Sequence, residues 1–261
     1  MIPLRDSIPA QRRPVVTQAL LALCAAVFAL QLADASGELV QRFGMVPARL
    51  LDPEHPPLAR DLVRTASGLR TVARPMPAAA VPDWLTVLSC TFLHGGWLHF
   101  LGNMLFLWIF GDNVEDRLGR LGYLGFYLGC GVAASLAHLY SAPESAVPTI
   151  GASGAIAGVM GAYMVLYPQS RVQMLVVWGF FVDFVVLPAP FFLGYWFVLQ
   201  FLQGALAGDA GATGGGVAFW AHIGGFVVGF AVALALRAGA WLRPAPPTIH
   251  LVRRRVGRAP W

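Results

Sequence analysis

Residues 149–167 read TIGASGAIAGVMGAYMVLY, and residues 219–229 read FWAHIGGFVVG. The first stretch places Ser153 among small residues at the start of an apolar run, and the second places His222 near the start of another. Polar side chains are costly in lipid, so inside a bilayer they should face a protein interior or a wet cavity. The two stretches therefore predict two membrane helices that bring a serine and a histidine together.

The composition agrees with a membrane protein. Of 261 residues, 57% are hydrophobic and 12% are charged, and the mean hydropathy is +0.64. A soluble domain of this size would struggle to hide so much apolar surface from water. All 18 basic residues are arginines, gathered in a few clusters, so nucleic acid is not expected as a partner. The three cysteines are dispersed and indicate neither a disulfide framework nor a metal site.

Six apolar runs come near the length of about 20 residues that a helix needs to cross the hydrocarbon core. They are Val15–Ala33, Trp97–Val114, Leu121–Tyr140, Thr149–Tyr167, Pro188–Ala207 and Val217–Leu236. A further run, Val172–Leu187, contains Asp183 and is followed by Pro188, so we interpret it as an interfacial or re-entrant connection. The sequence thus predicts an all-α polytopic membrane protein with six transmembrane helices.

The arginines predict the orientation, because positive charge near span ends is retained in the cytoplasm. Arginines lie in both termini and after spans two and four, whereas residues 141–148 and 208–216 contain none. Both termini should therefore be cytosolic. We expect a cytosolic tail over residues 1–13, a membrane domain over residues 14–240 with a long first loop at about 34–96, and a basic cytosolic tail over residues 241–261 that contacts anionic lipid headgroups.

Small residues on two of the helices predict a close contact between spans four and six. Positions three or four apart share a helical face, and small residues there let two backbones approach. The two faces are Ser153, Ala157 and Gly161 in span four, and His222, Gly225 and Gly229 in span six.

This contact would place the serine hydroxyl within reach of the imidazole, which a serine needs as its base. Spans four and six contain no Asp or Glu to orient the histidine, so the expected arrangement is a dyad. Gly151 and Gly154 beside the serine leave room for a substrate backbone.

Span two carries His99 and Asn103, four residues apart and therefore on one face. An imidazole and a carboxamide there can donate hydrogen bonds to a developing oxyanion, and the backbone N–H of Ser153 at a helix N-terminus is a third donor. His94 could close the loop over the cavity or support it. We interpret His138 as interfacial, and His55 and His250 as lying outside the spans.

Together these motifs resemble the rhomboid intramembrane serine proteases. The resemblance rests on His94-Gly95-Gly96-Trp97-Leu98-His99 with Asn103, on residues 111–119 (GDNVEDRLG), on Gly151-Ala152-Ser153-Gly154, and on Ala221-His222-Ile223-Gly224-Gly225 with Gly229. It implies a rhomboid-like fold of the bacterial six-span type in the cytoplasmic membrane. Ser153 would be the nucleophile, His222 the general base and acid, and His99 with Asn103 the oxyanion donors. Glu115 and Arg117 would form a structural ion-pair group.

The implied reaction is hydrolysis of a peptide bond in or near a transmembrane helix of a membrane-protein substrate, without a metal or organic cofactor. Its partners would be such substrates and the lipid bilayer; no oligomeric state is predicted. One departure stands at Ala157, where some members place an aromatic ring against the catalytic histidine, so the dyad here would be held less rigidly or by another side chain.

Three alternatives stay open. A catalytically silent rhomboid-like protein would bind or route membrane proteins, although such proteins usually lack the serine or the histidine. A transporter could use an intramembrane polar cluster, but we see no inverted repeat. A metalloprotease could use His94, His99 and His222, although this spacing differs from HExxH and no carboxylate accompanies it.

Overall fold

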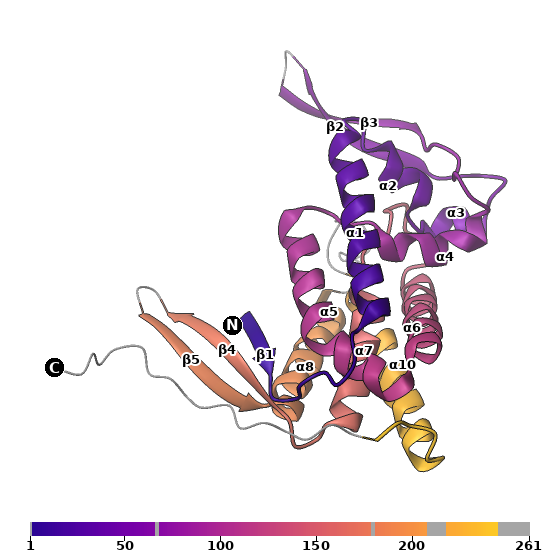
Figure 1. The fold of residues 1–261 in the computed structure, drawn as a ribbon. Helices are drawn as coiled ribbons and strands as arrows, with labels where there is room; N and C mark the ends of the chain where they lie inside the picture. The colour runs from indigo at the N-terminus through magenta and orange to yellow at the C-terminus, as the bar shows by residue number, and fades with distance from the viewer. Residues whose placement is uncertain (1, 66–67, 179–180, 208–217, 245–261) are drawn as a thin grey trace.

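The computed structural model describes residues 2–65, 68–178, 181–207 and 218–244. Six long helices form a bundle (Figure 1). They are α1 (Val15–Ala33), α5 (Trp97–Leu118), α6 (Arg120–Ser141), α7 (Ser153–Leu166), α8 (Ala189–Ala207) and α10 (Phe219–Ala238). Each run predicted as a helix therefore overlaps one of these helices, and Val217, the first residue of the sixth run, lies outside the described residues.

Helix α7 forms the centre of the bundle and packs against α5, α6, α8 and α10. Twelve of its 14 residues are buried, since it is surrounded by other helices. The predicted helix over Thr149–Tyr167 begins later than expected, at Ser153, because the preceding residues run alongside the first loop. There the backbones of Thr149 and Met45 exchange hydrogen bonds of 2.7 and 3.1 Å.

Glycines bring α7 and α10 into backbone contact. A Cβ atom added at Gly225 would collide with the carbonyl oxygen of Gly154, and one added at Gly229 with that of Gly158. The predicted face of α10 is thus confirmed. On α7 the predicted Gly161 is part of the contact, since a Cβ atom there would collide with the carbonyl oxygen of Phe226, whereas Gly154 and Gly158 meet Gly225 and Gly229 in place of Ser153 and Ala157.

Four of the described helices are long and apolar enough to cross a membrane, namely α1, α6, α8 and α10. Helix α5 has sufficient length but carries charged residues from Asp112 to Arg117 at its C-terminal end, and α7 has only 14 residues. The chain is an integral multi-pass membrane protein.

The run Val172–Leu187, which we interpreted as an interfacial or re-entrant connection, is a β-hairpin between α7 and α8. Its strands are β4 (Arg171–Trp178) and β5 (Phe181–Pro188), and β4 also pairs antiparallel with β1 (Ile2–Asp6). The side chains of Val172, Met174 and Val176 are buried, an alternation of two residues that is typical of a strand. The sheet stands at the side of the helix bundle (Figure 1).

The first loop is folded, which further corrects the all-α prediction. It contains the helices α2 (Glu38–Phe43), α3 (Pro47–Leu51) and α4 (Thr86–Ser89), the 3-10 turns η1 (Asp83–Leu85) and η2 (Cys90–Phe92), and a hairpin of β2 (Leu58–Thr65) and β3 (Gly68–Pro75).

Buried Arg49 connects separate segments of the first loop through its guanidinium group. Its guanidinium pairs with Asp83 at 2.8 Å and donates to the carbonyl oxygens of Gln41 and Gly44 at 2.7 and 3.0 Å.

Glu115 caps the first turn of α1 instead of forming the expected ion pair with Arg117. Its carboxylate accepts hydrogen bonds from the backbone N–H groups of Val16 and Thr17 at 3.0 and 2.8 Å, and from the Thr17 hydroxyl at 2.9 Å. A helix N-terminus leaves such N–H groups without partners and favours negative charge. Arg117 Nε donates to the carbonyl oxygen of Arg243 at 2.7 Å.

Candidate active site

Ser153 and His222 lie in direct hydrogen-bond contact. The distance from Ser153 Oγ to His222 Nε2 is 2.7 Å. Ser153 is the first residue of α7, and His222 lies in the first turn of α10. The glycine contacts between these two helices, made by Gly225 against Gly154 and by Gly229 against Gly158, hold the backbones close enough for the short serine side chain to reach the ring.

Gly151 shapes the segment that leads into Ser153. Its φ angle is +127°, a region that side-chain-bearing residues rarely adopt. A Cβ atom there would also lie 2.7 Å from His99 Nε2, and the Gly151 N–H donates to the carbonyl oxygen of Cys90 at 2.9 Å. Glycine thus lets the His99 ring lie directly against the backbone before the serine.

The hydrogen bond to the His99 ring defines its protonation. The Gly95 N–H donates to His99 Nδ1 at 3.2 Å, so Nδ1 carries the lone pair and, in the neutral ring, Nε2 carries the proton. Asn103, one turn further along α5, is 7% exposed, and its Nδ2 has no hydrogen-bond partner among the described residues. Within the described residues, both side chains therefore offer an N–H donor without a hydrogen-bond partner in the cavity wall to which Ser153 also belongs.

These four side chains line one cavity of about 700 Å³. Its walls come from α5, α6, α7, α8, α10 and residues 145–150. Residues far apart in the sequence thus meet at one place, and the cavity is large enough for several residues of an extended peptide.

Sequence reasoning missed the residues of α8 that contact His222. Gln200 Oε1 lies 2.7 Å from His222 Nδ1, and the ring centroid of Trp196 lies 5.7 Å from that of the imidazole, with 37° between the planes. Both residues line the cavity. Both approach the histidine from α8. Ala157 of α7 is small and provides no aromatic ring against the imidazole. The signal that could have found Gln200 is its polarity within an apolar helix.

His138, which we interpreted as interfacial, also lines the cavity. Its Nδ1 is buried and has no hydrogen-bond partner among the described residues. The last turns of α6 end beside the cavity, so its side chain faces inward. His55 is exposed and lies 3.2 Å from Asp52, and His250 lies outside the described residues.

His94 packs against His99 and is not among the residues that line the cavity. The side chain is 2% exposed, and its ring packs edge-on against His99 with the centroids 5.5 Å apart. Gln31 of α1 fixes its backbone, donating to the carbonyl oxygen and accepting from the N–H, both at 2.9 Å. Burial lowers the pKa of His94 to about 4, so the ring is neutral and acts as a packing surface for His99.

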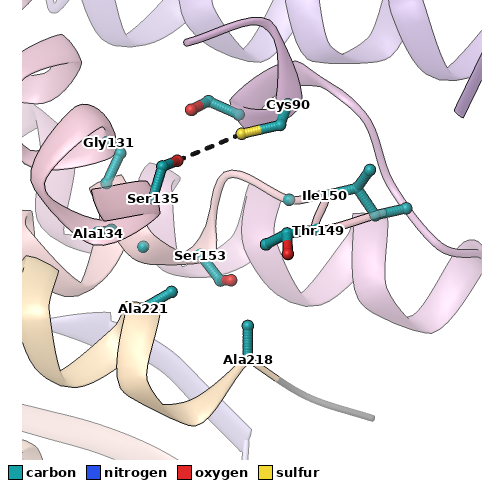
Figure 2. Close-up of a pocket in the computed structure, with 13 residues that line it drawn as sticks. Cys90, Gly131, Ala134, Ser135, Thr149, Ile150, Ser153, Ala218 and Ala221 are labelled. Carbon is teal, nitrogen blue, oxygen red and sulfur yellow. Dashed lines mark hydrogen bonds between the residues drawn. The ribbon is translucent and has the colours of Figure 1, made fainter. Parts of the chain in front are cut away.

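A second, smaller cavity of about 20 Å³ lies behind Ser153 (Figure 2). Its wall includes Cys90 and Ser135, whose Sγ and Oγ atoms are 3.3 Å apart. A polar cavity of this size can hold about one water molecule.

The comparisons with known proteins identify the family. The family model described as "Rhomboid domain" matches residues 81–239, which is more than half of the chain. A plant relative, "Rhomboid-like protein 11, chloroplastic" of Arabidopsis thaliana, is 41% identical over 78 residues, covering 30% of this chain and 28% of the relative.

Two microbial relatives match longer stretches. "Rhomboid protein 1, mitochondrial" of Saccharomyces cerevisiae is 28% identical over 155 residues, covering 57% of this chain and 41% of the relative. "Rhomboid protease GluP" of Bacillus subtilis is 29% identical over 178 residues, covering 67% and 31%. The aligned region thus spans less than half the length of each of these relatives. On the strength of the matched domain, the chain belongs to the rhomboid family.

Proposed function

We propose that this protein is an intramembrane serine endopeptidase that hydrolyses peptide bonds in or near transmembrane helices of other membrane proteins. The observation that carries the proposal is the 2.7 Å hydrogen bond between Ser153 and His222 in the wall of a cavity of about 700 Å³. A serine hydroxyl is a weak nucleophile until a base takes its proton, and His222 is placed to do so.

The reaction begins with proton transfer from Ser153 Oγ to His222 Nε2 as Oγ bonds to the substrate carbonyl carbon. The carbonyl π electrons move to its oxygen, which becomes an oxyanion. When the C–N bond breaks, His222 returns the proton to the leaving amine, and the substrate acyl group stays on Ser153 as an ester. Water attacks this ester with His222 again as base, which releases the acid product and regenerates the serine.

His99 and Asn103 are the proposed donors to the oxyanion. The hydrogen bond from Gly95 leaves the proton of a neutral His99 on Nε2, beside Gly151, and Asn103 Nδ2 has no other partner among the described residues. The backbone N–H of Ser153, at the N-terminus of α7, adds a third donor. Such preformed donors cost little reorganisation when charge develops.

The two cavities suit the two halves of the reaction. The larger one accommodates a locally extended peptide, which a substrate helix must supply because intact helical hydrogen bonds shield its carbonyls. Small residues at the cleaved bond, and helix-weakening Gly or Pro nearby, are therefore the expected substrate features. The smaller cavity behind Ser153 can hold about one water molecule close to the acyl-enzyme ester.

The proposal includes six membrane spans with both termini in the cytosol of a bacterial cell. Helix α5 is long enough, with its charges confined to one end. Helix α7, at about 1.5 Å per residue, is roughly 21 Å long, less than the hydrocarbon thickness. It is enclosed by the other helices and need not meet lipid at either end.

Reconstitution in liposomes with a single-span test substrate tests this function. The wild-type protein should cut the substrate at a site that maps in or near its span, and its serine should react with a fluorophosphonate. Ser153→Ala and His222→Ala should each abolish cleavage while the melting temperature stays near that of the wild type. Cleavage near the wild-type rate in either variant would refute the dyad, and cleavage blocked by a chelator would indicate a metalloprotease.

A further inference from the structure

We propose that Gln200 is a positioning residue that makes His222 a competent base, so that the site works as a Ser153–His222–Gln200 arrangement. This inference rests on the proposed function. Its basis is the geometry of the ring, because Nε2 lies 2.7 Å from Ser153 Oγ and Nδ1 lies 2.7 Å from Gln200 Oε1. The two ring nitrogens thus have one partner each, from two different helices.

The amide oxygen selects the tautomer of the imidazole. An amide carbonyl oxygen can only accept a hydrogen bond, so Gln200 Oε1 requires the proton to be on Nδ1. In the neutral ring, Nε2 then carries the lone pair that points at the serine hydroxyl. The opposite tautomer would place a proton between His222 and Ser153 and could not accept another. Gln200 thereby supplies the orienting contact for which spans four and six contain no carboxylate.

Helix α8 supplies a second contact to the same ring. Trp196 and Gln200 are four residues apart and therefore share one face of α8, and the Trp196 ring lies 5.7 Å from the imidazole between centroids. Together they fix the ring in two directions, one by a hydrogen bond and the other by packing. This explains how the histidine is held although Ala157, four residues after the serine, is too small to contact it as an aromatic ring would.

A neutral amide gives this arrangement a property that a carboxylate would not. A carboxylate beside Nδ1 would stabilise the protonated imidazole by direct charge attraction, and Gln200 fixes the tautomer with much less of that effect. Replacing Gln200 by Glu should therefore preserve the tautomer but change the pH below which His222 is protonated and cannot act as a base. This difference separates a positioning role from simple packing.

The test uses three variants of the full chain in liposomes. Gln200→Leu keeps the bulk but removes the acceptor, and Gln200→Glu keeps an acceptor and adds charge. Gln203→Leu is the matched control, because it removes an amide from the exposed surface of the same helix. For each, kcat and KM are measured across pH with the single-span substrate, together with the melting temperature and the rate of fluorophosphonate labelling.

We expect Gln200→Leu to lower kcat by roughly 10- to 100-fold with little change in KM, the usual effect of losing a group that orients a functional histidine. Gln203→Leu should match the wild type. Gln200→Glu should be more active than Gln200→Leu, with the acidic limb of its kcat profile moved up by about one pH unit or more.

The inference is overturned if Gln200→Leu cleaves within about twofold of the wild type, or if Gln203→Leu loses as much. If Gln200→Leu has a clearly lower melting temperature than the wild type, the pH profile of Gln200→Glu becomes the test. An acidic limb of kcat that does not move refutes the positioning role, and a limb that moves supports it. A wild-type protein that neither cleaves nor reacts with the probe would instead refute the proposed function itself.

Discussion

The α-carbon of Gly225 lies against the carbonyl oxygen of Gly154, so closely that a Cβ atom at position 225 would collide with it. Gly154 directly follows Ser153, and Gly225 is one turn after His222. The distance between the serine and the histidine therefore depends on the backbone contact of Gly225 with Gly154, which leaves no room for a side chain at position 225.

This contact predicts that Gly225→Ala lowers both stability and cleavage. Overpacking of this kind typically costs about 1–3 kcal/mol, and the helices can relieve it only by moving His222 away from Ser153. Gly129→Ala is the control, because a Cβ atom there meets nothing within 4 Å, so it should be neutral or slightly stabilising. Melting temperature and cleavage rate are compared for both. A Gly225→Ala protein that melts and cuts like the wild type would mean that the helices are not in this contact.

Loss of an oxyanion donor should slow cleavage without destroying the nucleophile. Asn103→Ala and His99→Ala should each lower kcat by on the order of 10²–10³-fold, since the donor acts mainly on charge that develops in the transition state. Ser153 should still react with a fluorophosphonate in Asn103→Ala. If both variants cleave at the wild-type rate, α5 does not belong to the active site; if labelling and cleavage fall together with the melting temperature, the residues only pack.

Glu115→Ala should destabilise the bundle through α1. The substitution leaves the buried N–H groups of Val16 and Thr17 without their acceptor, and unsatisfied buried donors cost about 1–3 kcal/mol each. The matched control is Glu38→Ala, which removes a half-exposed glutamate from a surface pair with Arg42 at 3.5 Å, a kind of contact that contributes little. The melting temperature should fall clearly in the first variant and hardly in the second. Equal shifts would contradict the capping role.

The parts of the site that could be predicted are those with a local signature. Ser153 and His222 each stand among small residues at the start of an apolar run, and the helical repeat alone indicates which positions share their faces. His99 and Asn103 follow from the same repeat within one helix. The close approach of α7 and α10 was predicted for the same reason, and Gly161 of the predicted face takes part in it, although Gly154 and Gly158 meet Gly225 and Gly229 in place of Ser153 and Ala157.

The parts that could not be predicted depend on contacts between distant segments. Gln200 reaches His222 only because α8 packs beside α10, and nothing in the sequence between them indicates that pairing. The hairpin of β4 and β5 was missed because a short apolar run fits a strand and a buried helix equally well. The resemblance implied an ion-pair group of Glu115 and Arg117, whereas the folded chain uses Glu115 to cap a helix almost a hundred residues away.

The buried carboxyl of Asp6 predicts a pH dependence of stability. It lies in β1 and accepts hydrogen bonds from the Tyr163 hydroxyl and, at 2.9 Å, from the Asn113 amide. Burial raises the pKa of Asp6 to about 6, although the Tyr163 hydrogen bond lowers it. Between pH 4 and 6 the unfolded chain has lost this proton while the folded protein keeps it, so this group makes the protein less stable as the pH rises through that range.

Asp6→Asn should remove this penalty, because an amide oxygen can accept both hydrogen bonds without carrying charge. The melting temperature of the variant should rise relative to the wild type as the pH increases from about 4 to about 6. Above that pH the difference should stay constant, at a free energy of unfolding on the order of 3 kcal/mol. Asp34→Asn is the control of opposite sign: hydrogen bonds, first from the Ser36 side chain, lower the pKa of this exposed carboxyl, so any stability it contributes disappears as the pH falls. Melting curves of the three proteins in one detergent from pH 4 to pH 8 measure the differences. A flat difference between Asp6→Asn and the wild type would show that Asp6 does not change its protonation on folding.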